Sequence, residues 1–311
     1  MTVWVTGARG FIGRHVSKAY ADAGHRVAGL GHGAWAEADH TRWGVADWRN
    51  GEVSAANLDA MTATLGPPEV VVHLAGGSAV GPSFAQPAED FHRSVGAAAA
   101  LADWMRLRAP GAAVVMASSA AVYGAAHAGP IAEGAVCTPF SPYGFHKRMA
   151  ELLLESYARN FQLRVALVRF FSVYGPGLEK QLLWDACTRL NRQPEVLALG
   201  GTGNEVRDWL HVSDASRLIV LAGQAAGVHC PVLNGGTGLA TPIREVAMQL
   251  CESWPMRPPA LTFSGVSRAG DPPTLVADVS AARALGWRHQ VDWRAGMHEY
   301  VQWFQSRHLP S

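Results

Sequence analysis

Apolar segments alternate with helical segments through the first half of the chain, and this alternation constrains the fold more than any other feature. Apolar strands are predicted at residues 2–6, 25–30, 69–75, 112–118 and 164–171. Two long helices are predicted among the intervening segments, over residues 88–108 and 142–160. Strands that are apolar along their whole length are typical of a parallel sheet with helices on both faces. The sequence therefore predicts an α/β fold built on a doubly wound parallel sheet.

A glycine-rich turn directly follows the first predicted strand. In VTGARGFIGRHV, Gly7, Gly10 and Gly13 have the spacing G-x-x-G-x-x-G at the mouth of the first helix. Glycine permits a tight turn and a close approach of the backbone, so a pyrophosphate can bind at the helix N-terminus. In this position the motif predicts a dinucleotide site of the Rossmann type. The other loop residues expected to contact the cofactor are Arg9, Phe11 and Ile12.

The end of the second predicted strand bears on the choice of cofactor. NAD-binding units usually place Asp or Glu there for the ribose hydroxyls, whereas this chain has Gly31 and His32. Without an acid to repel a 2′-phosphate, Arg9 and His32 are available to pair with that group. We therefore narrowly prefer NADP(H), with NAD(H) as the alternative.

A second cofactor contact is predicted in the loop before the strand at 69–75. There the carboxylate of Asp47, next to Trp48, is suited to an adenine edge. An ordinary loop aspartate is an equally good interpretation of the same residue.

Composition and charge narrow the classes of function. The 311 residues are 49% hydrophobic and 16% charged, with a formal net charge of +1 and no polybasic run. Neither nucleic acid nor a membrane surface is therefore an expected partner, and no apolar run reaches spanning length. The four cysteines are widely spaced and the histidines form no HExxH pair, so we expect reduced thiols and no metal site. A strand predicted to begin within two residues of the N-terminus leaves no room for a signal peptide, so a cytoplasmic location is expected.

Tyr143 and Lys147 lie four residues apart in SPYGFHK, where Ser141 and Pro142 suit the first turn of a helix. A tyrosine pKa of about 10 is too high for a base near neutral pH. A lysine one turn away faces the same side of the helix and stabilises the phenolate. The pair is therefore suited to exchanging a proton with a sugar or alcohol oxygen while a hydride moves.

Together these motifs resemble the extended short-chain dehydrogenase/reductase family of nucleotide-sugar epimerases, reductases and dehydratases. The resemblance covers nearly the whole chain and includes TGARGFIG, VVHLAG, SSAAVYG, the Tyr143–Lys147 pair, RFFSVYGPG, VRDWLHVSD and RAGDPP…VAD. It implies that Tyr143 is the general acid/base and that Lys147 lowers its pKa and holds the nicotinamide ribose. It also implies that Ser119 hydrogen-bonds the reacting oxygen, although a hydroxyl at a strand end can simply cap local backbone.

The resemblance implies a nucleotide-diphosphate sugar as substrate. Arg207 and Arg268 fall where the family holds the diphosphate, and guanidinium groups suit phosphate oxygens, with surface ion pairs as the alternative. Ser172 stands where the family often has Asn, and Ser78 where close epimerases have Lys; both are expected substrate contacts. The strand-end residues expected to contact the cofactor are Leu74, Ala75 and Gly76.

The organisation that follows is a dinucleotide-binding domain over 1–171 and a smaller substrate lobe mainly over 172–311. After Phe171 the chain is turn-rich, and its elements are shorter. Residues 208–235 are expected to rejoin the sheet, so the two parts interleave. The resemblance also implies a homodimer through the two long helices.

Three functions are consistent with these residues. Ala120 and Ala121 stand where 4,6-dehydratases carry acids, so dehydration is not expected. A 4-epimerase, with transient hydride transfer at sugar C4, is preferred because SSAAVYG and AVGPSFAQP resemble that group most. An NAD(P)H-dependent 4-keto reductase is the alternative, favoured by the missing ribose acid. A non-catalytic dinucleotide-binding regulator is a third hypothesis.

Overall fold

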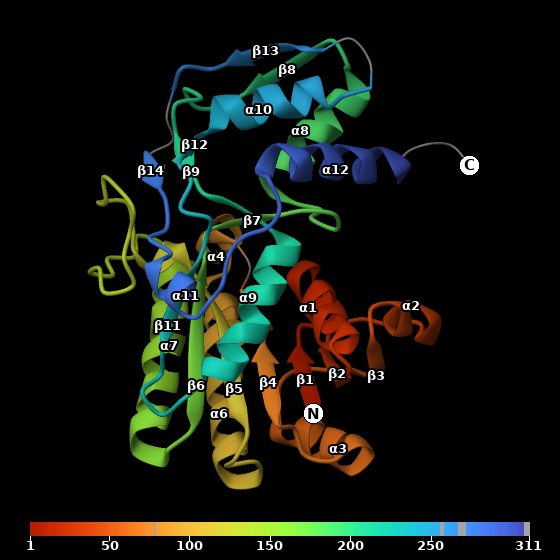
Figure 1. Ribbon diagram of the computed structural model, residues 1–311, viewed down its shortest axis with the longest axis vertical. Helices are drawn as coiled ribbons and strands as arrows, with labels where there is room; N and C mark the ends of the chain where they lie inside the picture. The colour runs from red at the N-terminus through yellow and green to blue at the C-terminus, as the bar shows by residue number, and fades with distance from the viewer. Residues whose placement is uncertain (78, 256–257, 267–271, 308–311) are drawn as a thin grey trace.

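A seven-stranded parallel sheet forms the centre of the computed structural model, which describes residues 1–77, 79–255, 258–266 and 272–307 (Figure 1). The strand order is β11-β6-β5-β4-β1-β2-β3, and every neighbouring pair is parallel. The strands are β1 (Thr2–Thr6), β2 (Arg26–Gly31), β3 (Val45–Asn50), β4 (Val70–His73), β5 (Ala113–Ser119), β6 (Arg164–Phe170) and β11 (Val232–Gly235). The predicted doubly wound α/β fold is confirmed.

Helices cover both faces of this sheet. Side chains alternate along β1, so Val3 and Val5 enter one core and Trp4 enters the other. The helices on the first face are α1 (Phe11–Asp22) and α9 (Val212–Ala225). Those on the second face are α3 (Ala55–Leu65), α6 (Ala97–Arg108) and α7 (Pro142–Phe161). Burial on both faces explains why the inner strands are apolar along their whole length.

A smaller group of elements packs around a core of its own beyond the carboxyl ends of the sheet strands (Figure 1). Its helices are α8 (Gln181–Arg192), α10 (Ile243–Glu252) and α12 (Trp293–Ser306). Its strand pairs are β8 (Val196–Leu199) with β13 (Ala260–Phe263), and β9 (Val206–Arg207) with β12 (Thr241–Pro242) and β14 (Thr274–Leu275). This group closes over the end of the sheet where ligands of parallel α/β folds bind.

The chain crosses between the two groups more than once. β10 (Trp209–His211) pairs with β7 (Ser172–Tyr174) outside the main sheet. The segment then continues into α9 and β11, and β11 pairs with β6 at the edge of the sheet. The division at Phe171 into a cofactor domain and a substrate lobe stays a prediction.

Two local features differ from the sequence prediction. Asp47 and Trp48 lie in β3 rather than in a loop; β3 is a polar edge strand in which only Val45 is buried, so it lacks the apolar run of its neighbours. The helix predicted over 88–108 consists of α5 (Pro87–Phe91), a π-helical turn (His92–Gly96) and α6. Within the described ranges, no helix has both the length and the apolar character needed to cross a membrane.

Candidate active site

A cavity of about 1750 Å³ lies between the carboxyl ends of the sheet strands and the smaller group of elements. It collects residues from the glycine loop, the end of β4, the end of β5, α7 and α8. The predicted site residues that line it are Gly7, Arg9, Gly10, Phe11, Ile12, Gly13, His32, Trp48, Leu74, Ala75, Gly76, Ser119, Tyr143, Lys147, Ser172 and Arg207. Ser78 and Arg268 lie outside the described residues.

The glycine loop forms a tight turn at one end of this cavity. Gly7 has a φ of +74°, and a Cβ on it would lie 2.9 Å from the Ala75 nitrogen, so only glycine fits. A Cβ on Gly13 would overlap the Gly7 carbonyl oxygen. Gly10 is the N-cap of α1, where no side chain caps the helix and no acid stands in the first turn. The first amides of α1, which no side chain caps, suit a pyrophosphate, so the residues present fit a dinucleotide.

The end of β2 lies beside the guanidinium of Arg9. A Cβ on Gly33 would lie only 2.6 Å from the Arg9 Nη1 atom. The Gly33 backbone is held from the other side, because its nitrogen donates to Asn50 Oδ1 at 2.9 Å and its carbonyl accepts from Trp48 Nε1 at 3.2 Å. Of the two neighbours in β3, Trp48 lines the cavity and Asp47 does not, since side chains alternate along a strand.

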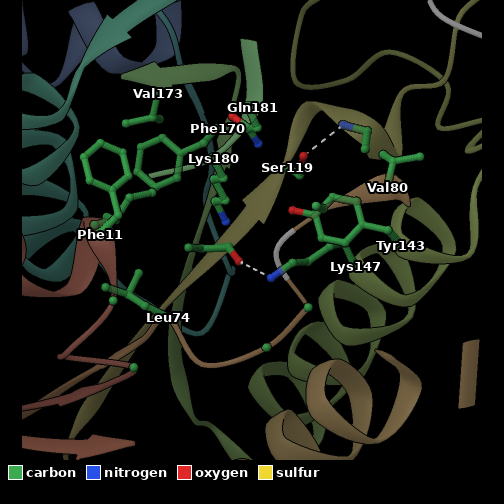
Figure 2. Close-up of a pocket in the computed structure, with 18 of the residues that line it drawn as sticks. Phe11, Leu74, Val80, Ser119, Tyr143, Lys147, Phe170, Val173, Lys180 and Gln181 are labelled. Carbon is green, nitrogen blue, oxygen red and sulfur yellow. Dashed lines mark hydrogen bonds between the residues drawn. The ribbon is translucent and has the colours of Figure 1, made fainter. Parts of the chain in front are cut away.

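Ser119, Tyr143 and Lys147 converge at the centre of the cavity, as Figure 2 shows. Ser141 caps α7, its Oγ accepting from the Gly144 nitrogen at 3.2 Å, and Pro142 occupies the first turn. The helix then presents Tyr143 and Lys147 on one face. The Lys147 ammonium donates to the Ala117 carbonyl oxygen at 3.1 Å, which anchors it to β5.

Burial dominates the acid–base properties of this set. It raises the pKa of Tyr143, against a hydrogen bond with Ser119 that lowers it, while the Asp90 charge raises it further. Burial also lowers the pKa of Lys147 to about 8, against the carboxylates of Asp90 and Glu151, which favour its charged form. We expected Lys147 to lower the pKa of Tyr143, but burial of the phenol is the largest influence and the pKa is raised.

Ser119 has two roles in this structure. Its Oγ accepts from the Ala121 nitrogen at 3.2 Å, which is the capping role weighed as the alternative. The same hydroxyl lies next to the hydroxyl of Tyr143 in the cavity (Figure 2). The cap orients the hydroxyl so that it hydrogen-bonds the phenol of Tyr143, and the proton it donates there can instead be donated to a substrate oxygen.

Arg207 lines the cavity on the side of the smaller group of elements. Its Nη1 donates to the carbonyl oxygens of Val206 and Pro272, both at 2.8 Å. These bonds hold the guanidinium in one orientation. Ser172 lines the same cavity from β7.

Lys180 is a site residue that sequence reasoning missed. Its side chain extends from the start of α8 into the cavity toward Tyr143 and Lys147 (Figure 2). It is close enough to Lys147 to lower that residue's pKa, and burial lowers its own. The adjacent Gln181 has a φ of 66°, the left-handed region that side chains rarely adopt. The available signal was the scarcity of lysine, since only three occur in 311 residues.

In the described part of the chain, no group of three or more His, Cys, Asp or Glu side chains is arranged to hold a metal ion. The four cysteines there are unpaired.

Comparisons with known proteins agree with this architecture. Residues 3–235 match the model of the NAD dependent epimerase/dehydratase family. The UDP-glucose 4-epimerase of Azospirillum brasilense is 33% identical over 304 residues, which cover 92% of this chain and 86% of that protein. The structure of MoeE5 with UDP-glucuronic acid and NAD has 31% identity and a TM-score of 0.86, covering 99% of this chain and 100% of that one. The UDP-glucose 4-epimerase of Brucella ovis with NAD is also 31% identical, with a TM-score of 0.86 and coverage of 97% and 98%.

Proposed function

The chain belongs to the NAD-dependent epimerase/dehydratase family, and on this premise we propose that it is a UDP-sugar 4-epimerase. The observation that carries the proposal is the convergence of Ser119, Tyr143 and Lys147 in one cavity, between the glycine loop and Arg207. That combination supports proton transfer beside a dinucleotide site and a diphosphate site. The similar proteins named above are UDP-glucose 4-epimerases or bind a UDP-sugar with NAD.

The residues divide the work of the reaction among them. A nicotinamide cofactor, when bound, supplies reversible two-electron redox chemistry at sugar C4. Tyr143 takes the proton of the C4 hydroxyl as that carbon is oxidised, and returns it to the C4 oxygen of the inverted sugar. Ser119 orients the C4 oxygen by donating its hydroxyl proton to that oxygen. Lys147 stabilises the phenolate by its charge and is placed to hold the nicotinamide ribose.

The neighbours of Ser119 restrict the reaction. Ala120 and Ala121 carry no proton-transfer group, and a dehydratase needs a further acid and base to expel water. Oxidation at C4 followed by its reversal needs none. This contrast separates an epimerase from a dehydratase on the same scaffold.

Incubation of the purified protein with UDP-glucose and catalytic NAD⁺, followed by NMR of the sugar, tests the proposal. We expect UDP-galactose to appear without net consumption of the cofactor. Stoichiometric oxidation of NADPH with a 4-keto sugar, and no interconversion, would instead identify a 4-keto reductase.

We propose NAD(H) as the working cofactor, on the strength of the similar proteins that bind NAD. Arg9 beside Gly33 is the feature that favours NADP(H), since it brings a guanidinium to the end of β2. Calorimetric titration with NAD⁺ and NADP⁺ decides between them. With Arg9→Ala, selective loss of NADP⁺ affinity would show a 2′-phosphate contact; Lys18→Ala, on the exposed face of α1, is the matched control.

We also propose a homodimer through α7. Phe145, Met149 and Leu152 recur at helical spacing and remain 50%, 44% and 49% exposed, an apolar stripe that invites burial. Leu152→Glu with Phe145→Glu is expected to yield a monomer in light scattering, while an unchanged mass would contradict this interface. A cytoplasmic location and the absence of a nucleic-acid partner stay predictions from the sequence.

A further inference from the structure

A largely buried acid–base pair, His146 and Asp90, lies next to the candidate catalytic residues, since His146 adjoins Lys147 in α7. His146 Nδ1 lies 2.6 Å from Asp90 Oδ2, and the two side chains are only 12% and 8% exposed. The ring of Phe91 packs edge-on against His146 at 5.5 Å between centroids. His146 immediately precedes Lys147 on α7, so this contact ties the catalytic helix to α5.

The Asp90 carboxylate also reaches the loop that follows β4. A Cβ on Gly77 would overlap Asp90 Oδ1, so the carboxylate packs against the loop backbone. A Cβ on the adjacent Gly76 would lie 3.5 Å from Lys147 Nζ. The Asp90 carboxylate and the Lys147 ammonium therefore lie against two consecutive residues of one loop, Gly77 and Gly76.

The segment over residues 80–91, which contains Asp90, contacts α7 at a second point. The Ser83 hydroxyl, in α4 (Val80–Ala85), accepts from the Tyr143 nitrogen at 3.0 Å and donates to the Val80 carbonyl oxygen at 2.7 Å. Ser83 is fully buried. Tyr143 and His146 are thus both attached to residues 80–91, and the first turn of α7 cannot shift without breaking one of these contacts.

The negative charge of Asp90 affects the pKa values of the candidate catalytic residues. On α7 it faces His146, Tyr143 and Lys147, and it raises the pKa of both Tyr143 and Lys147. Its neighbour on α5, Glu89, instead pairs with Arg93 at 2.6 Å and is 48% exposed. The other charged groups that act on Lys147 are Glu151 and Lys180.

We propose that Asp90, held by His146, is a positioning residue that fixes Lys147 and Tyr143 and sets the pH range over which they work. The inference rests on the proposed function, because it assigns a pH range to that same site. The distances and burial carry it, and the chemistry requires nothing beyond a fixed negative charge beside a phenol and an ammonium group.

The direction of the effect follows from the sign of the charge. Removing a negative charge stabilises the phenolate, so Tyr143 would become a base at lower pH. It also destabilises the ammonium, so Lys147 would lose its proton at lower pH. Both limbs of the pH–rate profile therefore move toward acid. Loss of a merely structural contact lowers the rate without moving either limb.

Profiles of kcat against pH for the wild type and Asp90→Asn test the proposal. Asn preserves the shape and an accepting oxygen but removes the charge. We expect both limbs to shift to lower pH by roughly half a unit or more, the scale of a nearby partly screened charge. Asp103→Asn, which removes an exposed carboxylate of α6, should leave the limbs in place. Unmoved limbs, or limbs that move apart, in Asp90→Asn would overturn the inference.

His146→Gln separates the effect of the His146–Asp90 contact on positioning from the effect of the Asp90 charge. Gln can still donate to Asp90, so the charge stays and we expect limbs within about 0.3 units of the wild type, with a several-fold loss of kcat from looser positioning. A shift as large as that of Asp90→Asn would overturn the assignment of the effect to Asp90. If Asp90→Asn does not fold, Asp90→Glu retains the charge and should retain the limbs.

Titration of the tyrosine absorbance gives a readout that does not need turnover. The signal of Tyr143 is isolated by subtracting a Tyr143→Phe background, with and without Asp90→Asn. Ionisation at lower pH in Asp90→Asn supports the inference even where no sugar is epimerised, a result that would count against the proposed function alone. An unshifted titration overturns the inference and leaves the proposed function standing.

Discussion

The ammonium nitrogen of Lys147 lies 5.8 Å from the centre of the Tyr143 ring. The two residues come from one helix, but their relative placement is fixed by another element, since Lys147 donates to the Ala117 carbonyl oxygen of β5. The ammonium group of Lys147 therefore lies beside the Tyr143 ring and is anchored to the sheet. This geometry lets a positive charge act on the phenol while both stay rigid.

Tyr143→Phe removes the hydroxyl that we propose transfers the proton, and little else. We expect kcat to fall by roughly 10²- to 10⁴-fold, the usual contribution of general acid–base catalysis, with UDP-sugar affinity nearly unchanged. Stopped-assay NMR gives kcat, and calorimetry gives the affinity. Tyr157→Phe, on the same helix and outside the cavity, is the control. Activity retained by Tyr143→Phe would show that another group transfers the proton.

Gly13→Ala should abolish dinucleotide binding. The added Cβ overlaps the Gly7 carbonyl oxygen, and the turn can relieve that overlap only by moving the backbone amides that we propose bind the pyrophosphate. Fluorescence titration with NADH measures the loss. Gly111→Ala is a matched control, because nothing lies within 4 Å of a Cβ there. Equal affinities of the two variants would refute the assigned role of the loop.

Much of this site could be predicted because its signals are local. The glycine spacing, the cap at Ser141 and the Tyr143–Lys147 interval each depend on residues within one turn or loop. Apolar runs identified the five inner strands for the same reason. β3 was missed because it is a polar edge strand. Its own residues show no apolar run that would predict its pairing with β2.

The features that escaped prediction depend on contacts between distant parts of the chain. Asp90 and His146 are 56 residues apart and meet only because α5 packs on α7. Lys180 enters the cavity beside a left-handed Gln181, and no propensity predicts that conformation for glutamine. From sequence alone, a charged residue near a turn is predicted to be exposed, and only the tertiary contacts show that Lys180 is buried.

Glu151→Gln tests the buried ion pair that supports α7. Arg169 in β6 donates to both Glu151 oxygens, at 2.9 and 2.8 Å, and the side chains are 3% and 0% exposed. Neutralising the carboxylate leaves a buried guanidinium without its counter-charge, so we expect a loss of about 3–5 kcal/mol in the free energy of unfolding. Urea denaturation measures it. Glu155→Gln, which breaks an exposed pair with Arg159, should cost under about 1 kcal/mol; comparable losses would contradict the argument.

Lys147→Met should stabilise the fold while it abolishes catalysis. Burial lowers the pKa of Lys147 from 10.5 to about 8, so the folded protein bears the cost of a charged buried amine wherever the lysine is protonated in both states. At 1.36 kcal/mol per pKa unit this cost is at most about 3 kcal/mol, and part of it is offset by the bond to Ala117 that methionine loses.

The stability gained by Lys147→Met should depend on pH. The penalty is complete below pH 8, declines as the unfolded chain binds the extra proton between pH 8 and 10.5, and vanishes above that range. The gain from Lys147→Met in urea denaturation should therefore be largest near neutral pH and disappear near pH 10.5. Comparison with Lys18→Met, an exposed lysine paired with Asp22, removes effects common to all charge deletions. If Lys147→Met destabilised the protein equally at both pH values, packing and the Ala117 bond would outweigh the charge, and the active-site lysine would not be held at the expense of stability.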